Sequence, residues 1–143
     1  NWEELKKKEK HQKTASDSVD AVARSLPGLW RAEKVQKKAA KVGFDWDSVD
    51  GAVDKLSEEL DEVKQAIAGH GDPAEELGDL LFAAVNVARF LKVAPEDALQ
   101  AACDKFAAQF RRVEEEVTAQ GKQMEDISLT ELDAIWNAIK HQP

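Results

Sequence analysis

The chain has 143 residues, of which 43% are hydrophobic, and this length is enough for one domain around a single buried core. Its 28 acidic and 20 basic side chains give a net charge of −8, which argues against a broad basic surface for nucleic acid. Because no apolar run approaches the roughly 18 residues that span a bilayer, and the one cysteine, Cys103, cannot form an internal disulfide, we expect a soluble cytoplasmic protein without a nucleic-acid or membrane partner.

Polar residues dominate positions 1–24, where few large apolar side chains could anchor a fold. We expect a loose arm, a linker or a short helix there, and we place the folded domain at residues 25–143. The first residue is Asn1 and not Met, so a fragment of a longer chain stays an open alternative. Pro27 suits a first helical turn, and the apolar spacing after it predicts a helix that ends near Gly43.

Three longer helices are predicted next, each with apolar residues at steps of three and four. The first covers residues 49–68 and has a narrow apolar seam. The second begins with Asp72 as its cap and Pro73 in its first position, and its wide leucine face to about residue 92 predicts the most buried element. The third opens at Pro95 and stops near Gly121.

A last helix is predicted after Ser128, which forms a capping-box sequence with Glu131. No segment shows the alternation of apolar and polar residues that is typical of a strand. The sequence therefore predicts an all-α fold, most simply an antiparallel helical bundle with short connections.

Carboxylates recur at a three-residue spacing beside the apolar faces of two successive helices. At about 100° per residue, Glu59 and Glu62 share one strip of the first helix, and Glu76 and Asp79 share a strip of the next. If these helices pack antiparallel, four carboxylates surround one small volume, where they repel one another unless hard cations such as Mg²⁺ or Mn²⁺ bind among them. A solvated acidic flank is the alternative interpretation.

The acidic phrases belong to a longer pattern that runs through the whole chain. Residues 58–62 read EELDE and residues 76–79 read ELGD, and LPGLWRAEKVQKKAAKVGFDW precedes them at residues 26–46. The order and spacing resemble the EExxE…ExxD signature of the MazG nucleoside triphosphate pyrophosphohydrolases. The opening NWEELKKKEK is similar to the segment before the C-terminal MazG domain of two-domain members.

This resemblance implies an all-α, usually dimeric enzyme that uses Mg²⁺, with Mn²⁺ as a substitute, to hydrolyse a nucleoside triphosphate to nucleoside monophosphate and pyrophosphate. By motif position, the metal ligands would be Glu59, Glu62, Glu76 and Asp79. Glu58 would be a further ligand or an outer support, and a general-base role for Glu58 or Glu59 is a secondary hypothesis.

The same motif positions imply substrate contacts. Three lysines would contact the phosphates: Lys55, Lys105 and Lys140, of which Lys105 would also be catalytic. Trp136 would lie near the nucleotide, and Asn86 and Arg89 would line the same pocket.

One helix departs from the family pattern. Members often read N-x-K-F-x-x-R-F there, whereas this chain has Cys103 and Gln109 in place of the Asn and the Arg. A lost guanidinium weakens phosphate contact and the stabilisation of charge in a transition state. A non-catalytic helical interaction module is therefore the alternative function, and the preferred base, the sugar and the number of metals stay open.

Overall fold

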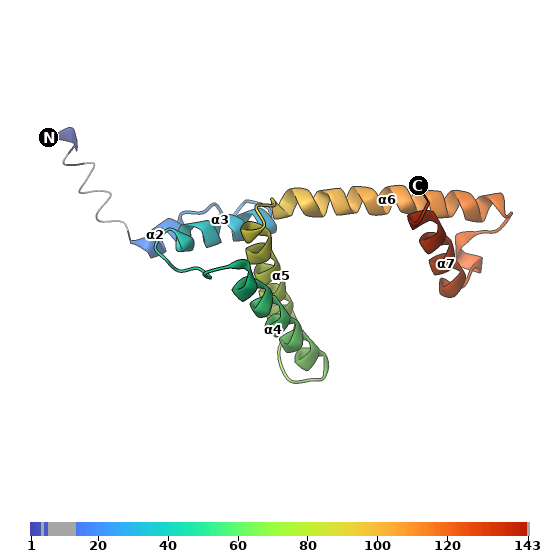
Figure 1. Ribbon diagram of the computed structural model, residues 1–143, viewed down its shortest axis with the longest axis horizontal. Coiled ribbons are helices and arrows are strands. Elements are labelled where there is room, and N and C mark those ends of the chain that lie inside the picture. The colour runs from blue at the N-terminus through green and yellow to red at the C-terminus, as the bar shows by residue number, and fades with distance from the viewer. Residues whose placement is uncertain (4, 6–13, 143) are drawn as a thin grey trace. The chain divides into compact units, whose positions relative to one another are not determined.

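The computed structural model describes residues 1–3, 5 and 14–142, and it divides into two units, residues 1–96 and 97–143, each of which we describe by itself (Figure 1). The regular elements are α2 (Ala15–Asp20), α3 (Gly28–Ala40), α4 (Val49–Ile67), α5 (Pro73–Phe90), α6 (Pro95–Ala119), the 3₁₀ turn η1 (Met124–Asp126) and α7 (Leu129–Lys140). The described residues contain no strand, so the predicted all-α fold class is confirmed.

The helix ends follow the local sequence signals. At the start of α5 the Asp72 carboxylate accepts a hydrogen bond of 3.0 Å from the Ala74 N–H, and Pro73 fills the first helical position. Gly69, just past the end of α4, has a φ of 94°, which a residue with a side chain rarely adopts. The Ser128 hydroxyl accepts from the Glu131 N–H at 3.2 Å and caps α7. Local hydrogen bonding therefore sets where these elements begin and end.

The predicted N-terminal arm contains the short helix α2. Thr14 and Asp17 form a reciprocal capping box that starts α2. The remaining part of that prediction at positions 4 and 6–13 lies outside the described residues.

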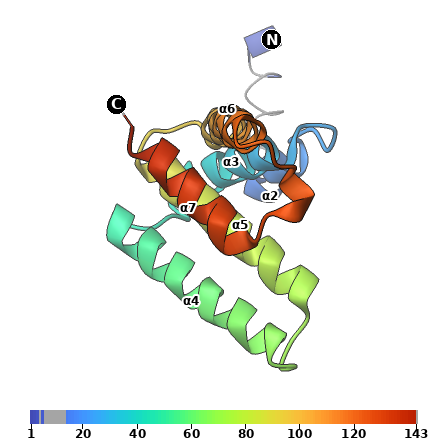
Figure 2. The same ribbon diagram turned by 90° about the vertical axis from the view of Figure 1, so that its right-hand side faces the viewer.

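The first unit is built around α5, which packs against both α4 and α3, while α2 packs against α3. Helices α4 and α5 run antiparallel as a hairpin, and both views show them side by side (Figures 1 and 2). Buried alanines of this pair, Ala52, Ala66 and Ala83, are small enough for the backbones to approach closely. The buried amide of Gln36 donates from Nε2 to the Phe82 carbonyl at 2.9 Å and so joins α3 to α5.

The prediction that the helix after Asp72 is the most buried element was wrong. Only Ala83 and Val85 of α5 are buried, whereas Leu77 and Leu81 keep 50% and 51% of their surface exposed. The reason is geometric: a leucine face this wide needs covering elements on several sides, and no element within the described residues covers these two leucines. The apolar face of α5 is therefore wider than the part of it that the described residues bury.

The second unit has its own small apolar core. Val113 and Val117 of α6 pack with Ile127 and with Ile139 of α7. Partly buried side chains surround this cluster: Met124, Leu132, Ile135 and Trp136. The capped helix α7 is thus held on the C-terminal half of α6 by side-chain packing.

Among the described residues, no helix combines the length and the apolar character that crossing a membrane requires.

Candidate functional site

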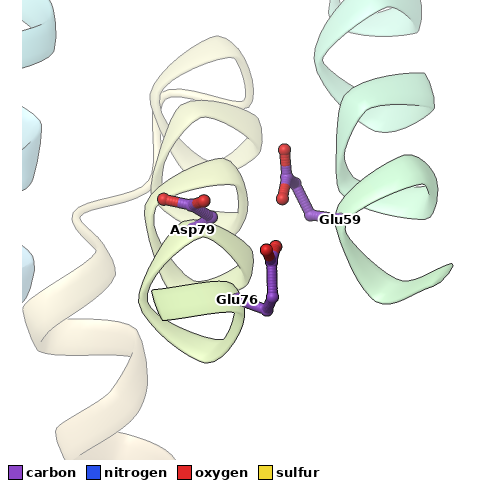
Figure 3. A group of neighbouring side chains, drawn as sticks. All are labelled: Glu59, Glu76 and Asp79. Atoms are coloured by element: carbon purple, nitrogen blue, oxygen red, sulfur yellow. The ribbon is translucent and has the colours of Figure 1, made fainter. Parts of the chain in front are cut away.

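Three carboxylates from two helices converge between α4 and α5. Glu59 comes from α4, and Glu76 and Asp79 come from successive turns of α5 (Figure 3). One oxygen of each side chain lies within 4.8 Å of the others. The antiparallel hairpin therefore brings three of the four predicted metal ligands into one group, which we call the acidic group.

The burial of the acidic group is uneven and is greatest at Glu59. Only 11% of the Glu59 side chain is exposed, although it carries a carboxylate. Its Oε1 atom forms an ion pair with Lys55 Nζ at 3.1 Å, and the same ammonium lies 3.3 Å from Oε1 of Glu58. These two partners, Glu59 first, raise the pKa of Lys55. A buried carboxylate requires such a cation, and here one lysine compensates for it.

Among the described residues, no cation forms such an ion pair with Glu76. Burial raises the pKa of the Glu76 carboxyl, and the charges of Glu62, Asp79, Glu75 and Glu59 raise it further. A carboxyl that holds its proton more tightly when folded makes the folded state less stable as pH rises through its folded pKa. At neutral pH the acidic group therefore carries unrelieved repulsion that a cation would remove.

The donor set of the acidic group fits a hard divalent cation. In octahedral Mg²⁺ sites the ligand oxygens lie about 2.1 Å from the ion and up to about 4 Å from one another. The 4.8 Å spread of the three carboxylates is close to that limit, so small side-chain rotations would bring one oxygen of each onto a shared ion. Carboxylate oxygens without nitrogen or sulfur donors suit Mg²⁺ or Mn²⁺.

Two other predicted acids stand apart from this group. Glu62, the fourth predicted ligand, is not among the three clustered carboxylates, although its charge contributes to the raised pKa of Glu76. The side chain of Glu58 is 61% exposed and its described partner is Lys55. The structure therefore places Glu58 outside the acidic group, while Glu62 acts on it electrostatically.

A cavity of about 740 Å³ adjoins the acidic group in the first unit. Lys55, Glu59 and Asp79 line one part of its wall, so the cavity and the acidic group share two carboxylates. Most of the remaining wall is apolar or aromatic, and it is formed by Val19, Val35, Ala39, Phe44, Trp46, Phe82 and Ala83. A ligand that binds here thus meets charge at one part of its surface and aromatic rings at another.

Asn86 and Arg89, two predicted pocket residues, do line this cavity. Arg89 Nη2 donates to Asn86 Oδ1 at 3.0 Å, and the guanidinium also forms a two-point ion pair with Asp45. The carboxylate of Asp45 therefore neutralises the positive charge of Arg89 in this structure.

The other predicted substrate residues belong to the second unit. Lys105 and Lys140 are exposed, and the partly buried Trp136 has its ring 5.3 Å from that of Phe106. Their expected contacts with a nucleotide stay predictions, since each unit is described by itself.

Sequence reasoning missed part of the cavity wall. Gln36, Phe44, Asp45 and Phe82 line it, and none of them was a candidate residue. The phrase GFDW was available as a signal, but residues 43–46 read locally as a simple connection between helices. Only the packing of that connection beside α5 reveals its place at the site.

Comparison with known proteins identifies the domain that carries these carboxylates. Residues 48–113 match the MazG nucleotide pyrophosphohydrolase domain. This match covers just under half of the chain and shows that residues 48–113 are similar to a MazG domain. The MazG match includes all of α4 and α5, and therefore the whole acidic group, together with Lys55, Arg89 and Lys105. It ends before Trp136 and Lys140.

Two of three similar proteins are named as nucleoside triphosphate pyrophosphohydrolases. The chain is 45% identical to the nucleoside triphosphate pyrophosphohydrolase of Escherichia coli strain K12, across 99% of this chain and 55% of that protein. It is 39% identical to the nucleoside triphosphate pyrophosphohydrolase/pyrophosphatase MazG of Thermotoga maritima, across 97% of this chain and 54% of that protein. The uncharacterized protein YabN of Bacillus subtilis is 46% identical across 98% of this chain and 29% of YabN. The chain thus spans about half the length of the two named enzymes that it matches.

Glu76→Gln tests the electrostatics of the acidic group. Because the charged form of Glu76 is disfavoured in the folded state, the variant should melt at a higher temperature than wild type in metal-free buffer at pH 7.5. The difference should shrink below the ordinary Glu pKa of 4.5, where the wild-type carboxyl is protonated in both states. Mg²⁺ should stabilise wild type at pH 7.5 and the variant much less.

The control is Asp61→Asn, an exposed acid on α4 that is not among the charges that raise the pKa of Glu76. It should keep the full Mg²⁺-induced rise in melting temperature. An equal rise in wild type and Glu76→Gln would contradict a cation site at Glu76.

Proposed function

We propose that this chain hydrolyses nucleoside triphosphates to nucleoside monophosphate and pyrophosphate, with Mg²⁺ held by Glu59, Glu76 and Asp79. The observation that carries the proposal is the acidic group at the edge of a partly aromatic cavity. The names of the Escherichia coli and Thermotoga maritima relatives support the same reaction. A nucleoside triphosphate joins charged phosphates to a flat, partly apolar base, and the cavity wall has a charged part and an aromatic part.

Magnesium ions bound at the acidic group would neutralise phosphate charge and polarise the α-phosphorus for attack by water. Glu62 lies near enough to act on Glu76 through its charge, and it would complete the ligand set directly or through water. Glu58, with its exposed side chain, has a supporting role beside Lys55 in this proposal.

Lys55 changes partners in the proposed cycle. In the metal-free chain its ammonium is paired with Glu59 and Glu58. If Glu59 held a cation, that carboxylate would no longer compensate for the lysine, and Lys55 would be free to contact the phosphates. Its place on the cavity wall beside Asp79 puts it within the same site. Lys105 and Lys140 would add further phosphate contacts, and Trp136 a contact with the nucleotide.

The alternative of a non-catalytic interaction module rests on Cys103 and Gln109. Exposed Cys103 and partly buried Gln109 both lie on α6, away in sequence from the acidic group. A chain without turnover gains nothing from keeping Glu59 buried and Glu76 uncompensated, since both weaken the fold. The intact acidic group therefore favours the enzyme.

Hydrolysis is tested by incubating the chain with Mg²⁺ and a panel of ribo- and deoxynucleoside triphosphates. We expect monophosphate and pyrophosphate as products, with kcat lowered by at least about 100-fold in Glu59→Gln and Asp79→Asn, because each removes a metal ligand. Asp61→Asn, an exposed acid on α4, is the control and should keep wild-type turnover. Circular dichroism should show the same helical content in all variants.

Two results would contradict the proposal. Release of orthophosphate and nucleoside diphosphate would mean that a different bond is cleaved. Wild-type rates in both ligand variants would remove the acidic group from the reaction.

We also propose that the chain forms a homodimer through the apolar face of α5. Leu77 and Leu81 of α5 and Leu60 of α4 are each 44–51% exposed, which is unusual for residues that follow a helical apolar stripe. Burial of this face against a second copy would remove it from water.

Leu81→Asp tests the dimer, because the exposed position tolerates a charge in one chain but not in an apolar interface. Light scattering after size exclusion should give the mass of two chains for wild type and of one chain for the variant. Leu129→Asp, at a leucine that is 81% exposed on α7, should stay dimeric. A monomeric wild type would refute this part of the proposal.

A further inference from the structure

The connection between α3 and α4, residues 41–48, is joined to α5 by a two-point ion pair. Arg89 Nη1 donates to Asp45 Oδ2 at 2.9 Å, and Arg89 Nη2 donates to Asp45 Oδ1. The side chains of Arg89 and Asp45 are only 13% and 23% exposed. A bidentate pair of this kind fixes both distance and orientation, so it holds the connection in one place.

The electrostatics of the pair are consistent with a stable contact. The hydrogen bonds from Arg89 lower the pKa of the Asp45 carboxyl, against the opposing effect of burial. Arg89 is fixed further by Asn86, which accepts from Nη2 at 3.0 Å. A guanidinium with these partners is a structural cation, whose removal would leave Asp45 partly buried without its charge partner.

The connection that this pair holds is also a wall of the cavity. Phe44 and Trp46, on either side of Asp45, both line it, although 82% and 42% of their surfaces remain exposed. Exposed aromatic rings on a cavity wall are surfaces on which a flat, partly apolar group can stack. The position of these rings depends on where residues 41–48 are held.

A second contact fixes Trp46. A Cβ atom at Gly51 would lie 3.0 Å from Cε3 of the indole ring, which is closer than carbon atoms normally approach. The missing side chain in the first turn of α4 therefore leaves room for Trp46 to lie against that helix. Asp45 and Trp46 thus anchor the connection to α5 and to α4 respectively.

We propose that Asp45 is a positioning residue for nucleoside binding: through Arg89 it holds residues 41–48 so that Phe44 and Trp46 form the wall on which the base lies. The inference rests on the proposed function in taking the cavity ligand to be a nucleotide. It assigns the two ends of that ligand to different parts of the first unit. The phosphates depend on the acidic group, and the nucleoside depends on the Asp45–Arg89 pair.

The test is equilibrium binding by calorimetry with the full chain in Mg²⁺. The probes are pyrophosphate, which has no nucleoside, and the four monophosphates AMP, GMP, CMP and UMP. In Asp45→Asn we expect monophosphate affinity to fall by at least about tenfold and pyrophosphate affinity to stay unchanged, because the charge-assisted hydrogen-bond pair with Arg89 is lost while the acidic group is left intact.

The chain offers a matched control and two further variants. Asp47→Asn lies in the same connection, is exposed, and should bind every probe as wild type does. Exchange of the pair, Asp45→Arg with Arg89→Asp, should recover part of the lost monophosphate affinity. Gly51→Ala should weaken monophosphate binding through Trp46 without loss of helical content, since Ala is the better helix former.

Each result bears on the inference separately from the reaction. Unchanged monophosphate affinity in Asp45→Asn overturns it, as does equal weakening for pyrophosphate, which would indicate a general loss of structure. Tighter pyrophosphate binding also overturns it, because Arg89 would then be a phosphate ligand that Asp45 restrains. A wild type that binds no monophosphate overturns it too. If wild type binds monophosphates with this dependence on Asp45 but hydrolyses no triphosphate, only the proposed function fails.

Discussion

The repulsion among Glu59, Glu76 and Asp79 is the constraint on which the site depends. The α4–α5 hairpin holds these carboxylates within 4.8 Å, although burial and neighbouring charges oppose ionisation of Glu76. Ala52, Ala66 and Ala83 of these two helices are almost fully buried, and residues this small allow helices to pack closely. The fold thus keeps an arrangement that is unfavourable without a cation, and that cost is explained if a cation is part of the working protein.

The cavity beside the acidic group has charged residues on one part of its wall and aromatic residues on another. Its wall includes Glu59 and Asp79, and its aromatic residues come from α5 and from the connection before α4. With a cation at the acidic group, a ligand with an anionic end and a flat apolar end would be favoured in one orientation. In our proposal the Asp45–Arg89 ion pair has a related role, because it holds the connection that carries Phe44 and Trp46 on the cavity wall. Orientation of the substrate is a large part of what such a site contributes to catalysis.

Local sequence signals predicted the helices well, but they could not predict contacts between residues that are far apart in the sequence. The cap at Asp72 and the helical spacing predicted α5 within two residues of its observed end at Phe90. The i, i+3 spacing placed Glu59, Glu76 and Asp79 on facing strips, because helix geometry alone fixes azimuth. Asp45 and Gln36 could not be found in this way, since their partners Arg89 and Phe82 lie 44 and 46 residues away. The prediction that α5 is the most buried helix failed for the same reason, because the spacing of its leucines shows an apolar face but not what covers that face.

The location of a divalent cation tests the central claim most directly. Crystals grown with Mn²⁺ should show anomalous scattering between α4 and α5, with carboxylate oxygens of Glu59, Glu76 and Asp79 about 2.2 Å from the ion. The same measurement on Glu76→Gln should show a much weaker peak or none. A Mn²⁺ peak elsewhere in the wild type, with these three side chains turned into bulk water, would contradict the account.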